Sequence, residues 1–248
     1  MNANSILKNP FVGLRPFESE DSLYYFGRTE HSKALLQVLH QSRLLAVVGS
    51  SGSGKSSLVR AGLIPNLEAG FLVQDRDRWH IAKMKPGDQP LVHLSASLLN
   101  AIDDSASDQS IESFSEAMRK QGVHAVLDKL HPLLSDAESN LLLLVDQFGE
   151  VFRLCTHTTD RSKQGVAAEF VAILLRLAEQ AELPVYVCLT MRSDYLGDCD
   201  TFPGLPEAVN RSQYLLPWLT RWQRREAIEG PIRLFGATTA GPLAERKR

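Results

Sequence analysis

A glycine-rich segment early in the chain has the pattern G-x-x-x-x-G-K-[ST], which is typical of a loop that binds phosphates. Glycines let the backbone pass close to a ligand, and the N–H groups at the start of the following helix attract anions. We expect Lys55 to reach the β- and γ-phosphates of a nucleoside triphosphate, and the Ser56 hydroxyl to bind Mg²⁺. The predicted nucleotide-binding residues of this loop are Gly49, Ser50, Ser51, Gly52, Ser53, Gly54, Lys55, Ser56 and Ser57. The pattern therefore predicts a site for ATP or ADP with Mg²⁺.

An apolar run at 141–145 ends in a carboxylate, Asp146. Such a run predicts a buried parallel strand, and ligands of open α/β sheets bind at the edge where the strands end. We expect Asp146 to hold Mg²⁺ there, directly or through a water molecule. Glu150 follows soon after and is a candidate base for the attacking water. The alternative for Glu150 is a solvated carboxylate at the start of a helix.

Three further residues are candidates for contact with the nucleotide. Arg192 follows the fourth predicted strand, at the same edge of the sheet, and is a candidate for contact with the γ-phosphate. An ion pair with a nearby aspartate is the alternative for Arg192. Phe26 and Arg28 are candidates to frame the adenine, with a simple turn before a helix as the alternative.

Strands that alternate with helices must position these residues. Short apolar segments predict strands at 44–48, 79–84, 141–145, 185–189 and 213–216, and the intervening segments repeat apolar residues at helical spacing. This order predicts an α/β fold, a three-layer P-loop NTPase core with a mainly parallel five-stranded sheet. We expect the helix after the glycine-rich loop to stop at Gly62 and Pro65, and the polar residues 104–115 to form a surface loop.

The chain divides into three predicted parts. Residues 1–28 form an irregular lead-in with a possible adenine-contacting loop, and residues 29–217 form the NTPase domain. Residues 218–248 are expected to begin a helical domain that is truncated here. Thr220 and Gln223 form a possible capping box for its first helix, which we expect to end at Gly230 and Pro231.

Composition narrows the class of protein. The formal net charge of -2 gives no support to nucleic-acid binding, and the 3 cysteines fit no zinc pattern. Apolar runs fall short of the ~20 residues that a membrane helix needs, and the N-terminus lacks the features of a signal peptide. We therefore expect a cytoplasmic protein that does not bind membranes.

With these motifs in place, the sequence resembles the novel STAND group of P-loop ATPases, of the type associated with WD repeats (STAND denotes signal-transduction ATPases with numerous domains). The likeness runs from about residue 11 to residue 232. It is carried by the segments 13–17, 25–28, 44–63, 146–152, 189–197 and 225–231. One departure is Gly149, which stands where the family usually has glutamate.

The resemblance implies a regulatory switch that binds ATP and hydrolyses it slowly. It also implies a C-terminal sensor, an effector, a possible ATP-dependent homo-oligomer and a role in signalling or defence. The alternative is a nucleic-acid-remodelling ATPase related to replication initiators, and a small-molecule kinase is a third possibility. We expect nucleotide to be the ligand and consider nucleic acid an unlikely one.

Overall fold

A parallel β-sheet forms the centre of the fold. The computed structural model describes residues 9–70, 78–102, 106–135, 138–156 and 161–239. Its strands are arranged in the order β2-β3-β4-β1-β5, and every neighbouring pair is parallel. The strands are β1 (Leu44–Gly49), β2 (Arg78–Met84), β3 (Ser139–Val145), β4 (Val185–Arg192) and β5 (Gln213–Leu215). The predicted five-stranded parallel sheet is confirmed.

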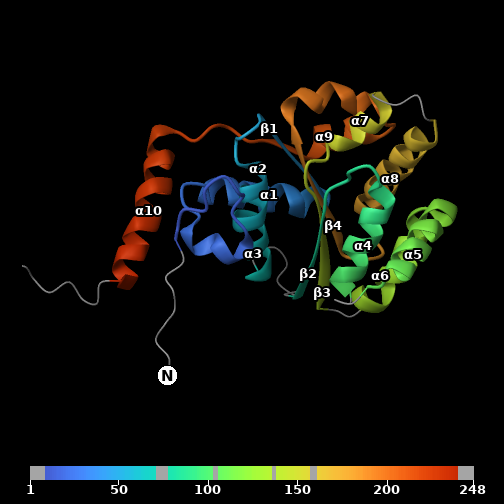
Figure 1. Ribbon diagram of the computed structural model, residues 1–248, viewed down its shortest axis with the longest axis horizontal. Coiled ribbons are helices and arrows are strands. Elements are labelled where there is room, and N and C mark those ends of the chain that lie inside the picture. The colour runs from blue at the N-terminus through green and yellow to red at the C-terminus, as the bar shows by residue number, and fades with distance from the viewer. Residues whose placement is uncertain (1–8, 71–77, 103–105, 136–137, 157–160, 240–248) are drawn as a thin grey trace, which may run out of the picture.

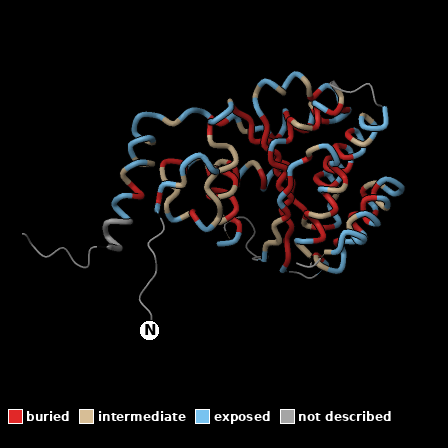
Figure 2. The backbone as a smooth tube through the Cα atoms, viewed as in Figure 1, coloured by how far each residue is buried: buried red, intermediate tan, exposed pale blue. Residues whose placement is uncertain are grey.

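Helices cover both faces of this sheet (Figure 1). Side chains of successive strand residues point to opposite faces, so Leu141 and Leu143 of β3 join one hydrophobic cluster, whereas Leu142 and Leu144 join the other. Figure 2 shows the buried strands between the two helical layers. The helices of one layer include α4 (Pro90–Ile102), α5 (Asp108–Gln121), α6 (Val123–Leu134) and α8 (Arg161–Glu179), and those of the other include α1 (Thr29–Ser42) and α3 (Ile64–Glu68). The predicted three-layer core is confirmed.

Shorter helical elements and connections complete the described chain. A 3-10 helix, η1 (Ser19–Tyr24), lies in the lead-in before α1. Four elements follow the ends of strands: α2 (Lys55–Ser57), η2 (Leu58–Leu63), α7 (Glu150–Thr156) and η3 (Ser193–Thr201). Two helices come later in the chain, α9 (Leu205–Ser212) and α10 (Arg221–Thr239). No helix of the described residues is both long and apolar enough to cross a membrane.

The segment predicted as a polar surface loop contains a helix. Helix α5 starts at Asp108, and Ser107 caps it by accepting a hydrogen bond from the Ser110 N–H at 3.3 Å. Phe114 and Met118 of this helix are buried against the core. The loop prediction was therefore wrong from residue 108 onward, because sparse apolar positions at helical spacing were hidden among serine and acidic residues. Residues 104 and 105 lie outside the described part.

The helix after the glycine-rich loop continues beyond Gly62, contrary to prediction. It widens into the π-helix η2 and then runs on as α3 to Glu68. Pro65 lies in the first turn of α3, where proline is tolerated. Gly62 is required by packing rather than by a turn, because a Cβ there would lie 2.5 Å from the Ser32 hydroxyl oxygen.

Helix α10 packs beside the lead-in and away from the sheet (Figure 1). Its predicted capping box is present: the Thr220 N–H donates to Gln223 Oε1 at 2.9 Å, and the Gln223 N–H donates to Thr220 Oγ1 at 3.2 Å. The predicted end at Gly230 and Pro231 was wrong, because the helix continues through Pro231 to Thr239. The division of the chain at residues 28 and 217 stays a prediction, and residues 240–248 lie outside the described part.

Candidate nucleotide-binding site

The glycine-rich loop joins β1 to the helix that begins at Lys55. Gly52 and Gly54 have φ angles of +74° and +92°, which L side chains rarely adopt. A Cβ on Gly49 would lie 2.9 Å from Ser53 Oγ, so the start of the loop also needs glycine. The Lys55 Nζ donates to the carbonyls of Gly49 and Ser50, at 2.9 and 2.8 Å, and therefore lies over the loop. Burial is the main cause that lowers the pKa of Lys55.

Asp146 lies at the end of β3, beside the loop, and its carboxylate is fully engaged. Its Oδ1 accepts from Ser56 Oγ at 2.8 Å, from Thr190 Oγ1 at 2.5 Å and from the Gln147 N–H at 3.1 Å. Its Oδ2 accepts from Arg60 Nη2 at 2.6 Å. Burial on its own would raise the pKa of Asp146, but the hydrogen bonds from Thr190 and Ser56, with the charge of Arg60, outweigh it and lower the pKa. The carboxylate is therefore ionised at neutral pH.

Ser56 and Asp146 together fit a magnesium ion. A hydroxyl and an ionised carboxylate are hard oxygen ligands, which Mg²⁺ prefers. Within the described ranges, no group of three or more His, Cys, Asp and Glu residues forms a separate metal site.

Glu150 lies at the first position of α7 and borders the cleft over the glycine-rich loop. Its Oε2 accepts from the backbone N–H of Gly87 at 3.1 Å, which fixes where the carboxylate lies. A Cβ on the neighbouring Gly149 would lie 2.4 Å from the ring of Tyr195, so a glutamate at this position would require the ring to move. Tyr195 in turn stacks on Phe152, with ring centroids 5.6 Å apart.

The cleft over the loop has a volume of about 690 Å³ and is lined by both signs of charge. The charged and polar residues that line it come from the lead-in, the loop with the helix that follows it, the ends of β2, β3 and β4, and α7. They include Arg15, Glu18, Lys55, Ser56, Arg60, Lys85, Asp146, Glu150, Arg153, Thr190 and Arg192. The structure therefore brings together the loop, the predicted metal ligands and both candidate catalytic residues.

Arg192 forms the ion pair that was the alternative to phosphate contact. Its Nε and Nη2 donate to the two carboxylate oxygens of Asp194, at 3.0 and 2.6 Å. Both side chains are more than half exposed, at 54% and 55%. Exposed pairs contribute little to stability, so a γ-phosphate can compete for Arg192, and contact with it stays a prediction.

Phe26 and Arg28 do not line the cleft. The buried guanidinium of Arg28 donates to the carbonyls of Ser53 and Pro217, at 3.0 and 2.9 Å. Phe26 packs against α10, where a Cβ on Gly230 would lie 2.5 Å from its ring. The structure thus gives both residues packing or linking contacts, and their contact with adenine stays a prediction.

Sequence reasoning missed Arg60, Thr190 and Glu18. Thr190 could have been found, because it lies near the C-terminal end of β4, at the same edge of the sheet as Asp146. Arg60 and Glu18 belong to segments that come together only in the fold, and no spacing rule links them.

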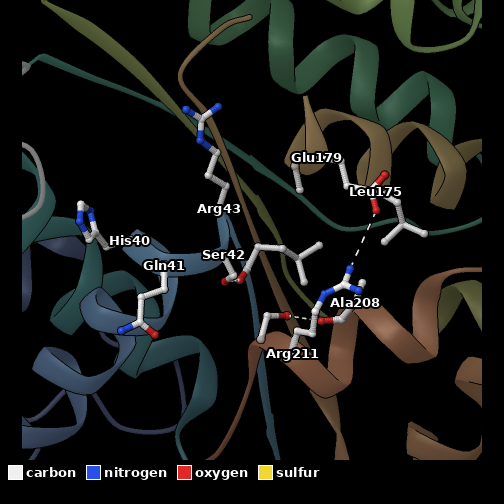
Figure 3. A pocket seen from close by; sticks show the side chains of 11 residues that line it. His40, Gln41, Ser42, Arg43, Leu175, Glu179, Ala208 and Arg211 are labelled. Carbon is white, nitrogen blue, oxygen red and sulfur yellow. Dashed lines mark hydrogen bonds and ion pairs between the residues drawn. The ribbon is translucent and has the colours of Figure 1, made fainter. Parts of the chain in front are cut away.

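A second cavity, of about 300 Å³, lies at the opposite edge of the sheet, where β1 begins (Figure 3). His40, Arg43, Glu179 and Arg211 line it, and Arg211 Nη2 lies 4.0 Å from Glu179 Oε1. Helices α1, α8 and α9 end here, and helix C-termini carry partial negative charge.

A comparison with known protein families agrees with a nucleotide-binding loop in this chain. The family model described as Novel STAND NTPase 1 matches residues 10–247. No curated protein matches the chain.

Several solved structures share the fold. The ORC2 protein of Aeropyrum pernix, in its ADPNP-ADP complexes, is 17% identical with a TM-score of 0.55, over 84% of this chain and 52% of that chain. A Walker-type ATPase of Pyrococcus abyssi is also 17% identical with a TM-score of 0.55, over 90% of this chain and 62% of that chain. The HORMA:CdnC:Trip13 complex of E. coli MS115-1 contains a chain that is 13% identical with a TM-score of 0.53, over 94% of this chain and 80% of that chain.

These identities show the fold alone, and this chain spans about half the length of the ORC2 chain. The family model, in contrast, covers nearly all of the sequence, including the glycine-rich loop and the strand that Asp146 follows. This chain therefore belongs to the novel STAND NTPase 1 family of P-loop NTPases.

Proposed function

We propose that this chain is the ATP-binding, slowly hydrolysing switch domain of a longer signalling or defence protein. One observation carries the proposal: Ser56 of the loop and Asp146 of β3 meet through a 2.8 Å hydrogen bond in a charged cleft. This meeting places a phosphate-binding loop beside an ionised carboxylate, as nucleotide binding with Mg²⁺ requires.

The binding step uses groups that are already positioned. The loop N–H groups cradle the phosphates, and Lys55 leaves the carbonyls of Gly49 and Ser50 to pair with them. Ser56 and Asp146 would hold Mg²⁺, which supplies charge neutralisation at the phosphate oxygens. Glu150, held by the Gly87 N–H, would orient the attacking water.

Two features favour slow turnover. Gly149 provides no second carboxylate beside Glu150, and the Tyr195 ring occupies the adjacent space. Arg192 must leave its paired contact with Asp194 before it can reach a phosphate. A switch requires a long-lived ATP state, so slow hydrolysis suits this role.

The described contacts also offer a path from the nucleotide to the rest of the protein. Arg28 joins the carbonyl of Ser53, in the loop, to that of Pro217, which leads into α10. We propose that this path reaches a C-terminal sensor and an effector, and that the ATP state can form homo-oligomers. The likeness to ORC2 is one of fold and supports no nucleic-acid function.

Titration calorimetry with ATP and ADP, in the presence of Mg²⁺, tests the binding part of the proposal. Lys55→Ala should abolish measurable affinity, because the loop loses the cation that reaches the phosphates. Lys33→Ala is the matched control, since Lys33 is an exposed lysine on α1 that pairs with Glu30. Equal affinities of the Lys55→Ala variant and the wild type would refute the site.

Hydrolysis tests the switch part. Steady-state turnover should fall well below ~10 s⁻¹, the median for enzymes. Turnover at or above that value would refute the slow switch while leaving nucleotide binding intact.

A further inference from the structure

Arg60 occupies an unusual place in the helix that follows the phosphate loop. It lies within η2, the π-helical stretch between α2 and α3. Single π-helical turns inside α-helices change the direction of the side chains around them and are frequent at functional sites. From this stretch the Arg60 side chain reaches Asp146, which follows β3.

The guanidinium of Arg60 bridges two carboxylates from distant segments. Its Nη2 donates to Asp146 Oδ2 at 2.6 Å, and its Nη1 donates to Glu18 Oε1 at 2.5 Å. The Arg60 side chain is 16% exposed, and the Glu18 side chain is 32% exposed. The buried Arg60 Nε finds no hydrogen-bond partner among the described residues.

The lead-in is anchored so that Glu18 stays at Arg60. The Phe17 N–H donates to Ser57 Oγ at 3.2 Å, and Ser19 Oγ donates to the carbonyl of Arg60 at 3.0 Å. Lys83 of β2 lies 3.9 Å from the other carboxylate oxygen of Glu18. Glu18 is therefore held between cations, and only Arg60 of these reaches Asp146.

We propose that Arg60 sets the positive charge that Mg²⁺ meets at Asp146, and that Glu18 reduces this charge. Ser56, Thr190 and a backbone N–H hold Oδ1 of Asp146, so the carboxylate keeps its orientation without Arg60, which pairs with Oδ2. The same cation repels Mg²⁺ at close range. Glu18 offsets part of that repulsion because it pairs with Arg60. The inference rests on the proposed Mg²⁺-nucleotide function.

The prediction is a pair of effects of opposite sign. Arg60→Met removes the competing charge, and it should lower the Mg²⁺ concentration for half-maximal binding of ADPNP by about fivefold. Glu18→Gln keeps the shape of the side chain but leaves Arg60 uncompensated, and it should raise that concentration by about threefold. Arg60→Lys keeps the charge and should stay close to wild type.

The measurement is a Mg²⁺ titration of ADPNP affinity by calorimetry, which needs no hydrolysis. Lys33→Met is the control, because it removes an exposed positive charge from α1, which does not border the cleft. Thermal melting confirms that each variant is folded. The double variant Glu18→Gln/Arg60→Met should match Arg60→Met alone, since Glu18 acts through Arg60.

The outcomes separate this inference from the proposed function. Shifts of the same sign in Arg60→Met and Glu18→Gln, or additive effects in the double variant, would overturn the role of Arg60 while the metal site stands. A wild-type ADPNP affinity that does not depend on Mg²⁺ would overturn the metal site itself, and the role of Arg60 with it. If Arg60→Met does not fold, Glu18→Gln alone decides, because an unchanged or lowered Mg²⁺ requirement contradicts the proposal.

Discussion

Replacement of Asp146 by asparagine tests how far the protein depends on this carboxylate in the absence of ligand. The amide oxygen can still accept from Ser56 and Thr190, but the amide NH₂ would then face Arg60 Nη2, with two donors opposed at 2.6 Å. Breaking a buried ion pair by removing one partner costs about 3–5 kcal/mol. Glu18 remains on Arg60 and reduces this cost. We therefore expect Asp146→Asn to lower the free energy of unfolding by about 2–3 kcal/mol.

Urea denaturation without nucleotide, at neutral and acidic pH, measures this effect. The folded-state pKa of Asp146 is depressed, so its contribution is present above the unfolded pKa of about 3.9 and is lost as pH falls through the lower, folded pKa. The difference between wild type and Asp146→Asn should shrink as the pH falls below about 4. A difference below about 0.5 kcal/mol at neutral pH would refute the reasoning about the Arg60 pair. The same variant should also lose the Mg²⁺-dependent part of ATP affinity, and an unchanged Mg²⁺ dependence would remove Asp146 from the metal site.

Three further variants test neighbouring residues of the cleft. Glu150→Gln should lower single-turnover hydrolysis by at least about tenfold without loss of ATP affinity, and a wild-type rate would place the base elsewhere. Arg192→Ala should reduce the preference for ATP over ADP in calorimetry, because only ATP carries the γ-phosphate. If the affinities for ATP and ADP fall equally, Arg192 does not contact the γ-phosphate, and its role is the ion pair with Asp194. Gly149→Ala should lower the unfolding free energy in urea by about 1–3 kcal/mol, because its Cβ must displace the Tyr195 ring, and no change would mean that the ring moves freely.

The sequence predicted those parts of the site whose structure depends on residues within one short segment. The phosphate loop follows from its glycine and lysine spacing, and β3 follows from an apolar run buried on both faces. The alternative partner of Arg192 was also within reach, since Asp194 lies two residues further along. In these cases the residues that interact, or the burial that selects them, lie within one short segment.

The contacts that escaped prediction are long-range or depend on backbone irregularity. Arg60 reaches Glu18 across 42 positions of sequence, and it lies in a π-helical stretch that no residue pattern predicted. Helix α5 was missed for another reason: Phe114 and Met118 are few among polar neighbours, and burial against the core outweighs that polarity. Both the Arg60–Glu18 contact and helix α5 depend on tertiary contacts that the local sequence does not contain.

The strand order has a consequence for the synthesis of this chain. Strand β1 carries the phosphate loop, yet its neighbours in the sheet are β4 and β5, which the ribosome makes much later. The tie between Arg28 and Pro217 closes over 189 positions of sequence. One edge of β1 stays unpaired until β4 has been made, and the other until β5 has been made, and exposed strand edges favour association with other chains. A nascent chain should thus become competent to bind nucleotide late, after the whole sheet can assemble, and early termination before β5 should yield an aggregating product.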